Sequence, residues 1–304
     1  MDTIQKNSYN DSMKIFTTKA WAKINLTLDI LGRRTDGYHN LSSVMQTVSL
    51  YDAIEMEIVE QPGISLSVVG GSGFPVSDMP AEEENLAYKA AQSLISVYNI
   101  HQGVSIKLTK NIPIAAGLAG GSADCAAVIN GMNELFNLKI PIEQLMKIGS
   151  KLGSDVPFCL TGGTARVDGL GERVEPLPAH PKTSLVLARL PILVSTKDIF
   201  SRWHGRSENQ TNAMIKAVQS SDIGKIADNL ANDLSPVVTN MHPEILELIA
   251  AFRKEKALGV NMSGSGPTVV AYYPTEADTL AAIKLIGKEF PDCEMFFCET
   301  LNLE

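Results

Sequence analysis

The chain has 304 residues and a mass of 32.8 kDa, enough for two domains at roughly 150 residues per domain. Apolar residues make up 44% and charged residues 20%, which argues against wholesale disorder and favours an ordinary packed core. With 26 Lys plus Arg against 34 Asp plus Glu, the net charge of −8 argues against a general nucleic-acid-binding protein. A small anion can still bind where positive potential is concentrated locally.

The cellular compartment is predicted from three kinds of sequence signal: a secretory leader, a membrane span and the spacing of cysteines. Residues 1–13 have neither a basic start nor an apolar stretch, so no secretory signal is predicted. The best apolar run, 185–194, is interrupted by Arg189 and Pro191 and is too short to span a membrane. Cysteines 125, 159, 293 and 298 lack zinc or redox spacing and are interpreted as buried thiols. We therefore expect a cytoplasmic protein without a membrane partner. The sequence leaves the choice between a monomer and a homodimer open.

The first half of the chain begins with sheet and continues with helices. Apolar and polar residues alternate strictly over 22–31, which predicts a half-buried strand with Lys23 and Asn25 on its polar face. The pair Asp36-Gly37 marks a turn after this strand. The predicted elements are strands at 22–31, 41–50, 54–59, 64–69 and 104–108, and helices at 85–98, around 128–136 and at 142–152.

A segment dense in glycine and proline, 154–182, precedes the second half. The predicted elements after it are strands at 184–190, 268–273 and 295–298, and helices near 211–218, 223–231, 243–256 and 276–289. Strands and helices alternate without the regular βα repeat of a doubly wound sheet. We therefore expect two α+β domains, at 14–179 and 180–304.

The sharpest local motif is PIAAGLAGGSAD, residues 113–124, where a strand leads through a glycine-rich loop into an alanine-rich helix. Its glycines let backbone approach a ligand, and a helix start offers unpaired N–H groups and the positive end of a dipole. This combination predicts phosphate binding. The loop is neither a Walker A nor a dinucleotide motif. The alternative is an ordinary helix start capped by Ser122 or Asp124.

Two further glycine-rich segments are weak signals by themselves. NMSGSGP, residues 261–267, stands directly before a predicted strand, and Gly162-Gly163 follows shortly after Asp155. The glycines of the first segment are equally typical of a tight turn. Several such loops in an acidic chain favour a polyphosphate that is held mainly by backbone dipoles.

Taken together and in order, AKINLTLDILGRRTDGYHNL, PIAAGLAGGSADCAA, GSDVPFCLTGG and NMSGSGPTVVA resemble the GHMP kinase family over about residues 20–300. The resemblance implies an N-terminal β/α nucleotide-binding domain and a C-terminal ferredoxin-like α+β domain, with the active site in the cleft between them. It also implies that ATP is the phosphoryl donor. DGYHNL beside AKIN resembles the members that phosphorylate the 2-hydroxyl of 4-diphosphocytidyl-2-C-methyl-D-erythritol, in the methylerythritol phosphate route to isoprenoids.

The resemblance implies two catalytic residues. Asp155, in GSDVP, matches the family's catalytic base, and Lys23 matches a lysine that keeps this base ionised and steadies the reacting oxygens. By itself, Asp155 is equally typical of a helix or turn cap, and Lys23 of a solvated strand face. The alternatives to this function are a homoserine- or mevalonate-type GHMP kinase and a non-catalytic nucleotide-binding regulator.

The nucleotide is expected to bind along the glycine-rich loop. Ser122 is the candidate ligand for Mg²⁺, which usually bridges phosphate oxygens and keeps few protein ligands. Asn85 matches a family position in the adenine pocket, although an asparagine there is also typical of a helix cap. The predicted nucleotide-binding residues are Asn85, Pro113, Ala115, Gly117, Leu118, Ala119, Gly120, Gly121 and Ser122.

The cytidine group is expected to meet Tyr38 and His39, because an aromatic ring stacks on a base and a neutral imidazole bonds its polar edge. Asn25 points the same way as Lys23 and is a candidate for substrate hydrogen bonds. Thr196 and Phe200 fit a family spacing in which an aromatic ring covers the other face of cytosine. Alternatively, Tyr38 and His39 are ordinary turn residues and Phe200 belongs to the core.

Overall fold

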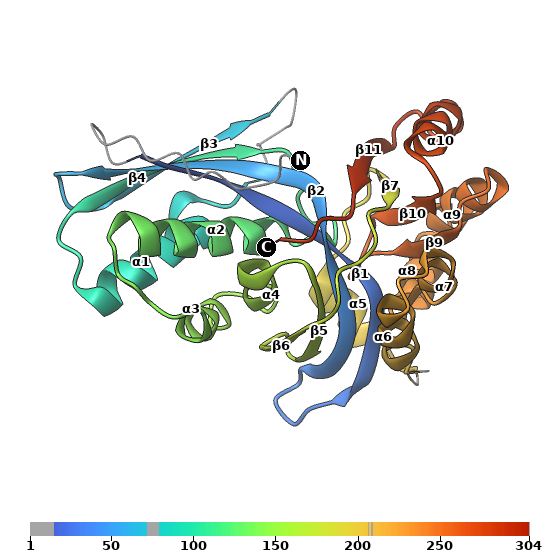
Figure 1. Ribbon diagram of the computed structural model, residues 1–304, viewed down its shortest axis with the longest axis horizontal. Coiled ribbons are helices and arrows are strands. Elements are labelled where there is room, and N and C mark those ends of the chain that lie inside the picture. Colours follow the sequence, from blue (N-terminus) through green and yellow to red (C-terminus); the bar gives the residue numbers. More distant parts are fainter. Residues whose placement is uncertain (1–14, 72–78, 206, 208, 304) are drawn as a thin grey trace. The chain divides into compact units, whose positions relative to one another are not determined.

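A computed structural model describes residues 15–71, 79–205, 207 and 209–303 (Figure 1). The chain folds as two compact units. Unit 1 holds the described parts of Met1–Ala22, Leu50–Ile114 and Ala119–Thr161. Unit 2 holds the described parts of Lys23–Ser49, Ala115–Leu118 and Gly162–Glu304. Strands β1 (Ile15–Arg33) and β2 (His39–Val59) contribute residues to both units.

Unit 1 packs helices against one face of a sheet (Figure 1). The second part of β2 pairs antiparallel with β4 (Gly103–Lys110), which pairs parallel with β3 (Ile64–Gly70). The apolar residues of β4 alternate and are buried, as half-buried strands require. The helices of unit 1 are η1 (Glu82–Glu84), α1 (Leu86–Tyr98), α2 (Gly120–Leu135), α3 (Ile142–Gly149) and α4 (Val156–Thr161).

Small residues bring α2 close to its neighbours. Helix α2 buries Ala123, Ala126 and Ala127 in the unit 1 core. A Cβ on Gly131 would overlap the sulfur of Met56, so glycine is what lets α2 approach strand β2. This close packing fixes the position of the whole helix, including its glycine-rich start.

Unit 2 contains an antiparallel four-stranded sheet in the order β11-β7-β10-β9. Helices α9 (Glu244–Lys254) and α10 (Glu276–Glu289) pack against it. This order, with α9 before β9 and α10 before β11, is the ferredoxin-like arrangement that the family resemblance implied for the C-terminal domain. The four strands are β7 (Ser184–Arg189), β9 (Gly259–Met262), β10 (Val269–Tyr273) and β11 (Glu294–Glu299).

The remaining elements of unit 2 are short. The first part of β2 pairs antiparallel with β5 (Thr164–Gly169), which pairs with β6 (Arg173–Pro176). Strand β8 (Ala231–Asn232) pairs parallel with β1. The helices are α5 (Thr196–Arg202), α6 (Thr211–Gln219), α7 (Ile223–Asp228) and α8 (Ser235–Met241).

The structure corrects the sequence-based elements in several places. Residues 41–50 and 54–59, predicted as two strands, belong to the single strand β2. The glycine- and proline-rich segment 154–182, for which no element was predicted, contains α4, β5 and β6. Helices α5 and α8 and strands β8 and β9 were also missed. The two units are discontinuous in sequence and do not divide at residues 179 and 180, so that boundary stays a prediction about the family domains.

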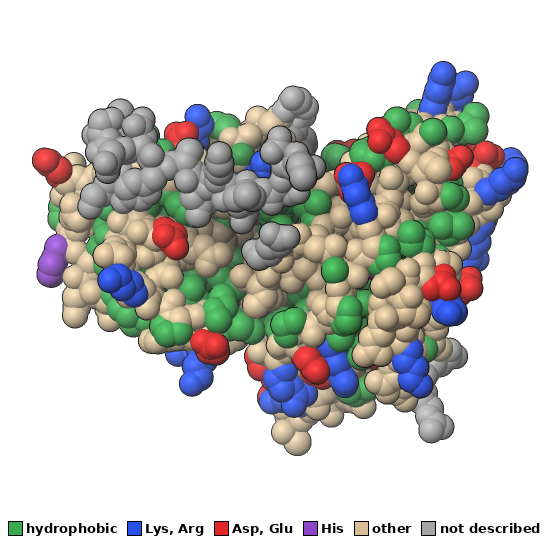
Figure 2. All heavy atoms as spheres, in the orientation of Figure 1, with side chains coloured by type: hydrophobic (Ala, Val, Ile, Leu, Met, Phe, Trp, Pro, Cys, Tyr) green, Lys and Arg blue, Asp and Glu red, His purple; other side chains and the backbone are tan. Residues whose placement is uncertain are grey.

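Acidic and basic side chains are interspersed on the face shown in Figure 2, and no single basic patch dominates it. Among the described residues, no helix has the length and apolar character needed to cross a membrane. Cys125 and Cys298 are buried, as the sequence predicted, whereas Cys159 and Cys293 are partly exposed.

Candidate active site

The start of helix α2, in unit 1, has no side-chain cap. Ala119 occupies the N-cap position in the left-handed conformation, with φ of 58°, and no side chain bonds the helix end. The first turn carries no acidic residue. The alternative in which Ser122 or Asp124 caps this helix is therefore wrong. An uncapped helix start keeps its unpaired N–H groups and dipole for an anion.

Asp124 is instead part of a buried ionic cluster with Lys110 and Asp52. The Lys110 ammonium donates to Asp124 at 2.7 Å and also to Asp52. Asp52 accepts the backbone N–H of Ile112 at 2.8 Å, at the start of the glycine-rich loop. A Cβ on Gly120 would lie 3.3 Å from the Lys110 nitrogen. The cluster therefore lies directly beneath the start of α2.

The charges of this cluster shift the pKa values of its members. Burial lowers the pKa of Lys110, but the carboxylates of Asp124 and Asp52 outweigh it, so the pKa is raised overall. Burial raises the pKa of Asp124 to about 8, against the opposing attraction of Lys110. Sequence reasoning missed this cluster. The available signal was that Lys110 continues the inward-facing register of Val104, Ile106 and Leu108.

The turn that carries Asp155 lies against the start of α2. A Cβ on Gly153 would be 3.4 Å from the Ser122 hydroxyl oxygen, which is ordinary van der Waals distance. Asp155 is partly buried and directly precedes α4. Asn85 is buried, and its side chain caps helix α1 by accepting the Ala87 N–H at 2.9 Å. Its cap role is thus established, and its adenine role stays a prediction.

Lys23 and Asn25, in unit 2, are buried although they lie on the polar face of β1. The Lys23 ammonium donates to the Asn25 side-chain oxygen at 2.7 Å and to the Gly117 carbonyl at 3.2 Å. The Asn25 amide donates to the Ser43 hydroxyl at 2.9 Å. The alternative of a solvated strand face is therefore wrong for Lys23. A buried ammonium is held here by backbone and amide oxygens.

The two glycine-rich loops meet within unit 2. Gly117 has φ of +75°, and a Cβ on it would collide with the Ser263 carbonyl oxygen. The Ser263 hydroxyl donates to the Gly117 carbonyl at 2.9 Å. Asn232, which the sequence analysis did not single out, donates to the carbonyls of Met262 and Gly264 at 2.7 and 2.8 Å. The second loop is thus a support for the first.

His39 and Phe200 form an aromatic pair in unit 2. Their ring centroids are 5.7 Å apart with planes inclined by 30°. Tyr38 is 65% exposed at the preceding turn. Burial, with a smaller effect of Arg33, lowers the pKa of His39, so its imidazole is neutral near pH 7. The Thr196 hydroxyl lies 2.8 Å from that of Ser265 and links helix α5 to the second glycine-rich loop.

The predicted site residues are distributed over both units. Lys23 belongs to unit 2 and Asp155 to unit 1, and their pairing stays a prediction. Unit 1 holds Asn85, Pro113, Ala119, Gly120, Gly121, Ser122 and Asp155, and unit 2 holds Lys23, Asn25, Tyr38, His39, Ala115, Gly117, Leu118, Thr196 and Phe200.

Known proteins match both halves of the chain. Residues 85–163 match the family model of the GHMP kinases N terminal domain, and residues 214–290 match the GHMP kinases C terminal model. A 4-diphosphocytidyl-2-C-methyl-D-erythritol kinase of Caldicellulosiruptor saccharolyticus is 41% identical over 277 residues, covering 89% of this chain and 93% of the relative. The chain belongs to the GHMP kinase family. A kinase of the same name from Pelotomaculum thermopropionicum is 43% identical, over 84% of this chain and 88% of the relative.

Solved structures of GHMP kinases share the fold. A crystal structure of 4-(cytidine 5'-diphospho)-2C-methyl-D-erythritol kinase matches with a TM-score of 0.77 and 29% identity, over 94% of this chain and 99% of that one. The L. major mevalonate kinase matches with a TM-score of 0.74 but 16% identity, over 97% and 99% of the two chains. The second match supports the fold alone.

Proposed function

We propose that this GHMP kinase transfers the γ-phosphoryl group of ATP to the 2-hydroxyl of 4-diphosphocytidyl-2-C-methyl-D-erythritol, a step of isoprenoid precursor biosynthesis. Relatives that are 36–43% identical over most of the chain bear the corresponding kinase name. The observation that carries the proposal is the stacked pair of His39 and Phe200, two segments far apart in sequence that form an aromatic group suited to a base. We propose that the enzyme acts in the cytoplasm, as a monomer or homodimer.

The ATP phosphates are proposed to bind at the start of α2. Gly120 and Gly121 place no side chain over the uncapped helix end, and Gly121 is exposed. Backbone N–H groups there are suited to β- and γ-phosphate oxygens. Gly117 and its neighbours keep the preceding turn in place through Ser263. Asn85 is proposed to line the adenine pocket while its side chain caps helix α1.

The chemical step is assigned to two residues. Phosphoryl transfer asks for alignment, charge neutralisation and a base for the hydroxyl proton. Asp155 is proposed to accept the proton of the 2-hydroxyl, and Lys23 to stabilise the negative charge that develops on the transferred group. The buried ammonium of Lys23 is already oriented by Asn25 and Gly117, so little reorganisation is needed when the substrate binds.

The cytidine group is proposed to bind at the aromatic side chains of Tyr38, His39 and Phe200. The exposed ring of Tyr38 and the ring of Phe200 are proposed to stack on cytosine, and the neutral imidazole of His39 to donate one hydrogen bond and accept another. Asn25 and Thr196 are proposed to bond the rest of the substrate. Changing Tyr38 or His39 to Ala is expected to raise KM for the cytidine substrate much more than KM for ATP.

Mg²⁺ is proposed to bind with the ATP phosphates. Among the residues that the structure describes, no group of three or more His, Cys, Asp or Glu side chains could hold a metal ion. The donors present therefore fit a metal that phosphate oxygens hold, with Ser122 as a hydroxyl ligand beside the Asp155 turn. Such an ion neutralises phosphate charge during transfer.

An ADP-release assay against a panel of alcohols tests the function. We expect turnover with the cytidine-linked methylerythritol diphosphate and none with homoserine, mevalonate or galactose. Turnover with one of those three instead would reject the proposed substrate. A protein that binds ATP but turns over none of the four would be a regulator.

The variant Asp155→Asn tests the assigned base. It is expected to lower kcat at least about a hundredfold, because general acid–base help is worth about that much. ATP and substrate binding should persist. The control Ser154→Ala changes the exposed neighbouring residue and should keep normal turnover. Near-normal kcat in Asp155→Asn would remove Asp155 from its role.

A further inference from the structure

A second aromatic residue contacts His39 from the end of helix α5. The Trp203 ring and the His39 imidazole form a T-shaped pair, with centroids 6.0 Å apart and planes at 84°. Phe200, three residues earlier, is stacked on the same imidazole at 5.7 Å. His39 is therefore stacked with one ring and T-shaped with the other, and both are favourable arrangements for aromatic pairs. Together the two contacts restrict the plane of the imidazole.

The end of helix α5 holds Trp203 in this position. The Ser195 side chain caps the start of the helix by accepting the Asp198 N–H. Ile199 is buried in the unit 2 core. Trp203 is the C-cap residue, and its N–H donates to the Phe200 carbonyl at 3.4 Å. Hydrogen bonds therefore hold both ends of helix α5, and the Phe200 and Trp203 rings lie at its C-terminal end.

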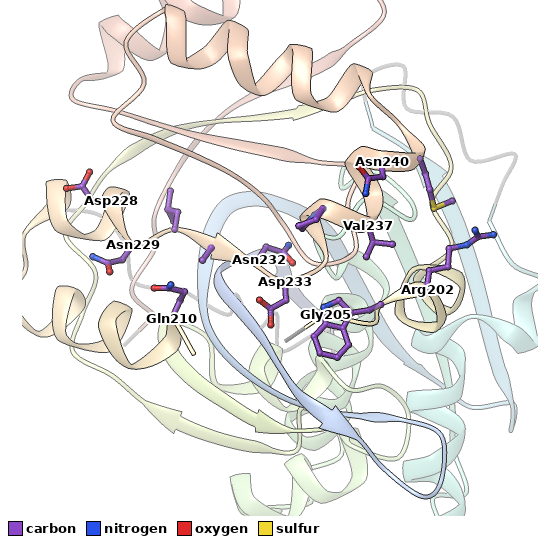
Figure 3. A pocket seen from close by; sticks show the side chains of 14 residues that line it. Arg202, Gly205, Gln210, Asp228, Asn229, Asn232, Asp233, Val237 and Asn240 are labelled. Carbon is purple, nitrogen blue, oxygen red and sulfur yellow. The ribbon is translucent and has the colours of Figure 1, made fainter. Parts of the chain in front are cut away.

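The indole also borders a cavity. Trp203 is one of the residues that line a cavity of about 760 Å³ in unit 2. Figure 3 shows this cavity, with Arg202 and Gly205 among its labelled lining residues. A Cβ on Gly205 would lie 3.2 Å from the indole nitrogen, so glycine lets the chain pass close to that edge. Because one side of the indole borders this cavity, removal of the ring would expose more of the His39 imidazole, which is already partly exposed, to water.

Because the His39 imidazole is neutral, the orientation of its ring decides where its donor and acceptor nitrogens point. Burial lowers the pKa of its imidazole, and the positive charge of Arg33 on β1 lowers it further. A neutral imidazole has one donor and one acceptor nitrogen at fixed angles. On the polar edge that such a ring would bond, cytosine has an amino donor and a ring-nitrogen acceptor, whereas uracil has a carbonyl acceptor and an N–H donor. The angle of the ring therefore affects how well it distinguishes the two bases.

We propose that Trp203 is a positioning residue for His39, and that its T-shaped contact with the imidazole sets the preference of the enzyme for cytidine over uridine in the substrate. The inference rests on the proposed function, because it assumes that His39 reads the base. It assigns a role to a residue outside the predicted site. Trp203 itself touches the imidazole and is not assigned to the reacting atoms.

Kinetics of Trp203→Ala provide the first test. Loss of one aromatic pair is expected to raise KM for the cytidine substrate about 3- to 10-fold. The kcat value and KM for ATP should stay within about twofold, since the phosphate site is unchanged. The cytidine-to-uridine ratio of kcat/KM should fall by about the same 3- to 10-fold factor. Unchanged KM and an unchanged ratio would overturn the proposal.

Two further variants separate positioning from general damage. Trp203→Phe keeps an aromatic ring and is expected to restore most of the KM and of the base preference, and it also guards against poor folding of the alanine variant. Arg202→Ala is the matched control, because this neighbour lines the same cavity and forms an exposed ion pair with Asp198. It should behave like the unchanged protein. Equal effects of Arg202→Ala and Trp203→Ala would overturn the proposal.

The titration of His39, followed by NMR without any substrate, makes the two hypotheses distinguishable. In Trp203→Ala the pKa of His39 should rise towards 6.5, because burial is the main cause of its lowering. In Trp203→Phe it should stay low. An unchanged titration in Trp203→Ala would overturn the positioning role. If the protein without any substitution failed to phosphorylate the cytidine substrate, that result would instead reject the proposed function.

Discussion

The two glycine-rich loops are supported by different chemistry. The loop that leads into α2 begins on the charged cluster, where Asp52 accepts the Ile112 N–H and is bonded in turn by Lys110. The loop at 261–267 is held by neutral groups, chiefly the Asn232 amide on two carbonyls. Both loops are rich in glycine, yet one depends on buried charges and the other on uncharged hydrogen bonds.

Because their supports differ, the two loops should differ in how strongly mutation and pH affect the stability of the protein. Removing one partner of a buried ion cluster leaves uncompensated charge, which is more costly than leaving neutral groups unpaired. A charged support also responds to pH, because its carboxyl groups titrate. A neutral amide support does not. The three predictions below compare the supports on these grounds.

The largest effect is expected for Lys110→Met. This variant leaves the buried carboxyl groups of Asp52 and Asp124 without their shared cation. We expect the free energy of unfolding to fall by about 3–5 kcal/mol, measured by urea denaturation at pH 7. ATP affinity should fall as well, since the start of the glycine-rich loop loses its support.

The matched control is Lys107→Met, which changes an exposed lysine on the opposite face of the same strand. Its stability should change by no more than about 0.5 kcal/mol. If Lys110→Met were as stable as this control, the charged cluster would not support the loop, and the contrast between the two loops would disappear.

A smaller loss is expected for Asn232→Ala. The variant leaves the Met262 and Gly264 carbonyls without the amide, and the Leu234 N–H without its acceptor. We expect about 2–3 kcal/mol of destabilisation, equal at pH 6 and pH 8. Asn229→Ala, whose amide bonds the exposed end of α7, is the control and should have little effect. A loss that depends on pH would contradict the neutral support.

The long elements could be predicted because their patterns are local. The strand at 22–31 and the helix at 276–289, with Thr275 as its cap, are confirmed by β1 and α10. The expectation that this strand is only half-buried is wrong, because its polar side chains are buried as well. The short elements α4, β5 and β6 were missed because tertiary pairing and packing determine them. The pairing of Leu41 with Gly169, for example, joins segments that no local pattern connects.

For the candidate site, the functional roles of the segments stay predictions, whereas the contacts that hold these segments come from the structure. The spacing that suggested Phe200 is consistent with its stacking on His39. The supports were missed, since Lys110, Asp52 and Asn232 stand in segments that read as ordinary strand and turn. A lysine in the inward register of β4 was the one local signal. Its two partners are distant in sequence, and only the folded chain identifies them.

The smallest effect, and the one that separates charged from neutral support most directly, is expected for Asp124→Asn. Burial raises the pKa of Asp124 from 3.8 to about 8, so between these values the folded chain holds a proton that the unfolded chain releases. The resulting stability is complete below pH 4 and is lost as the pH rises through about 8. Asparagine cannot titrate. Between pH 6 and pH 8 the unchanged protein should therefore lose about 2 kcal/mol relative to the variant, since each pH unit is worth at most about 1.4 kcal/mol. Parallel stability curves for the two proteins would mean that Asp124 is already ionised, and that the cluster keeps both negative charges across this range.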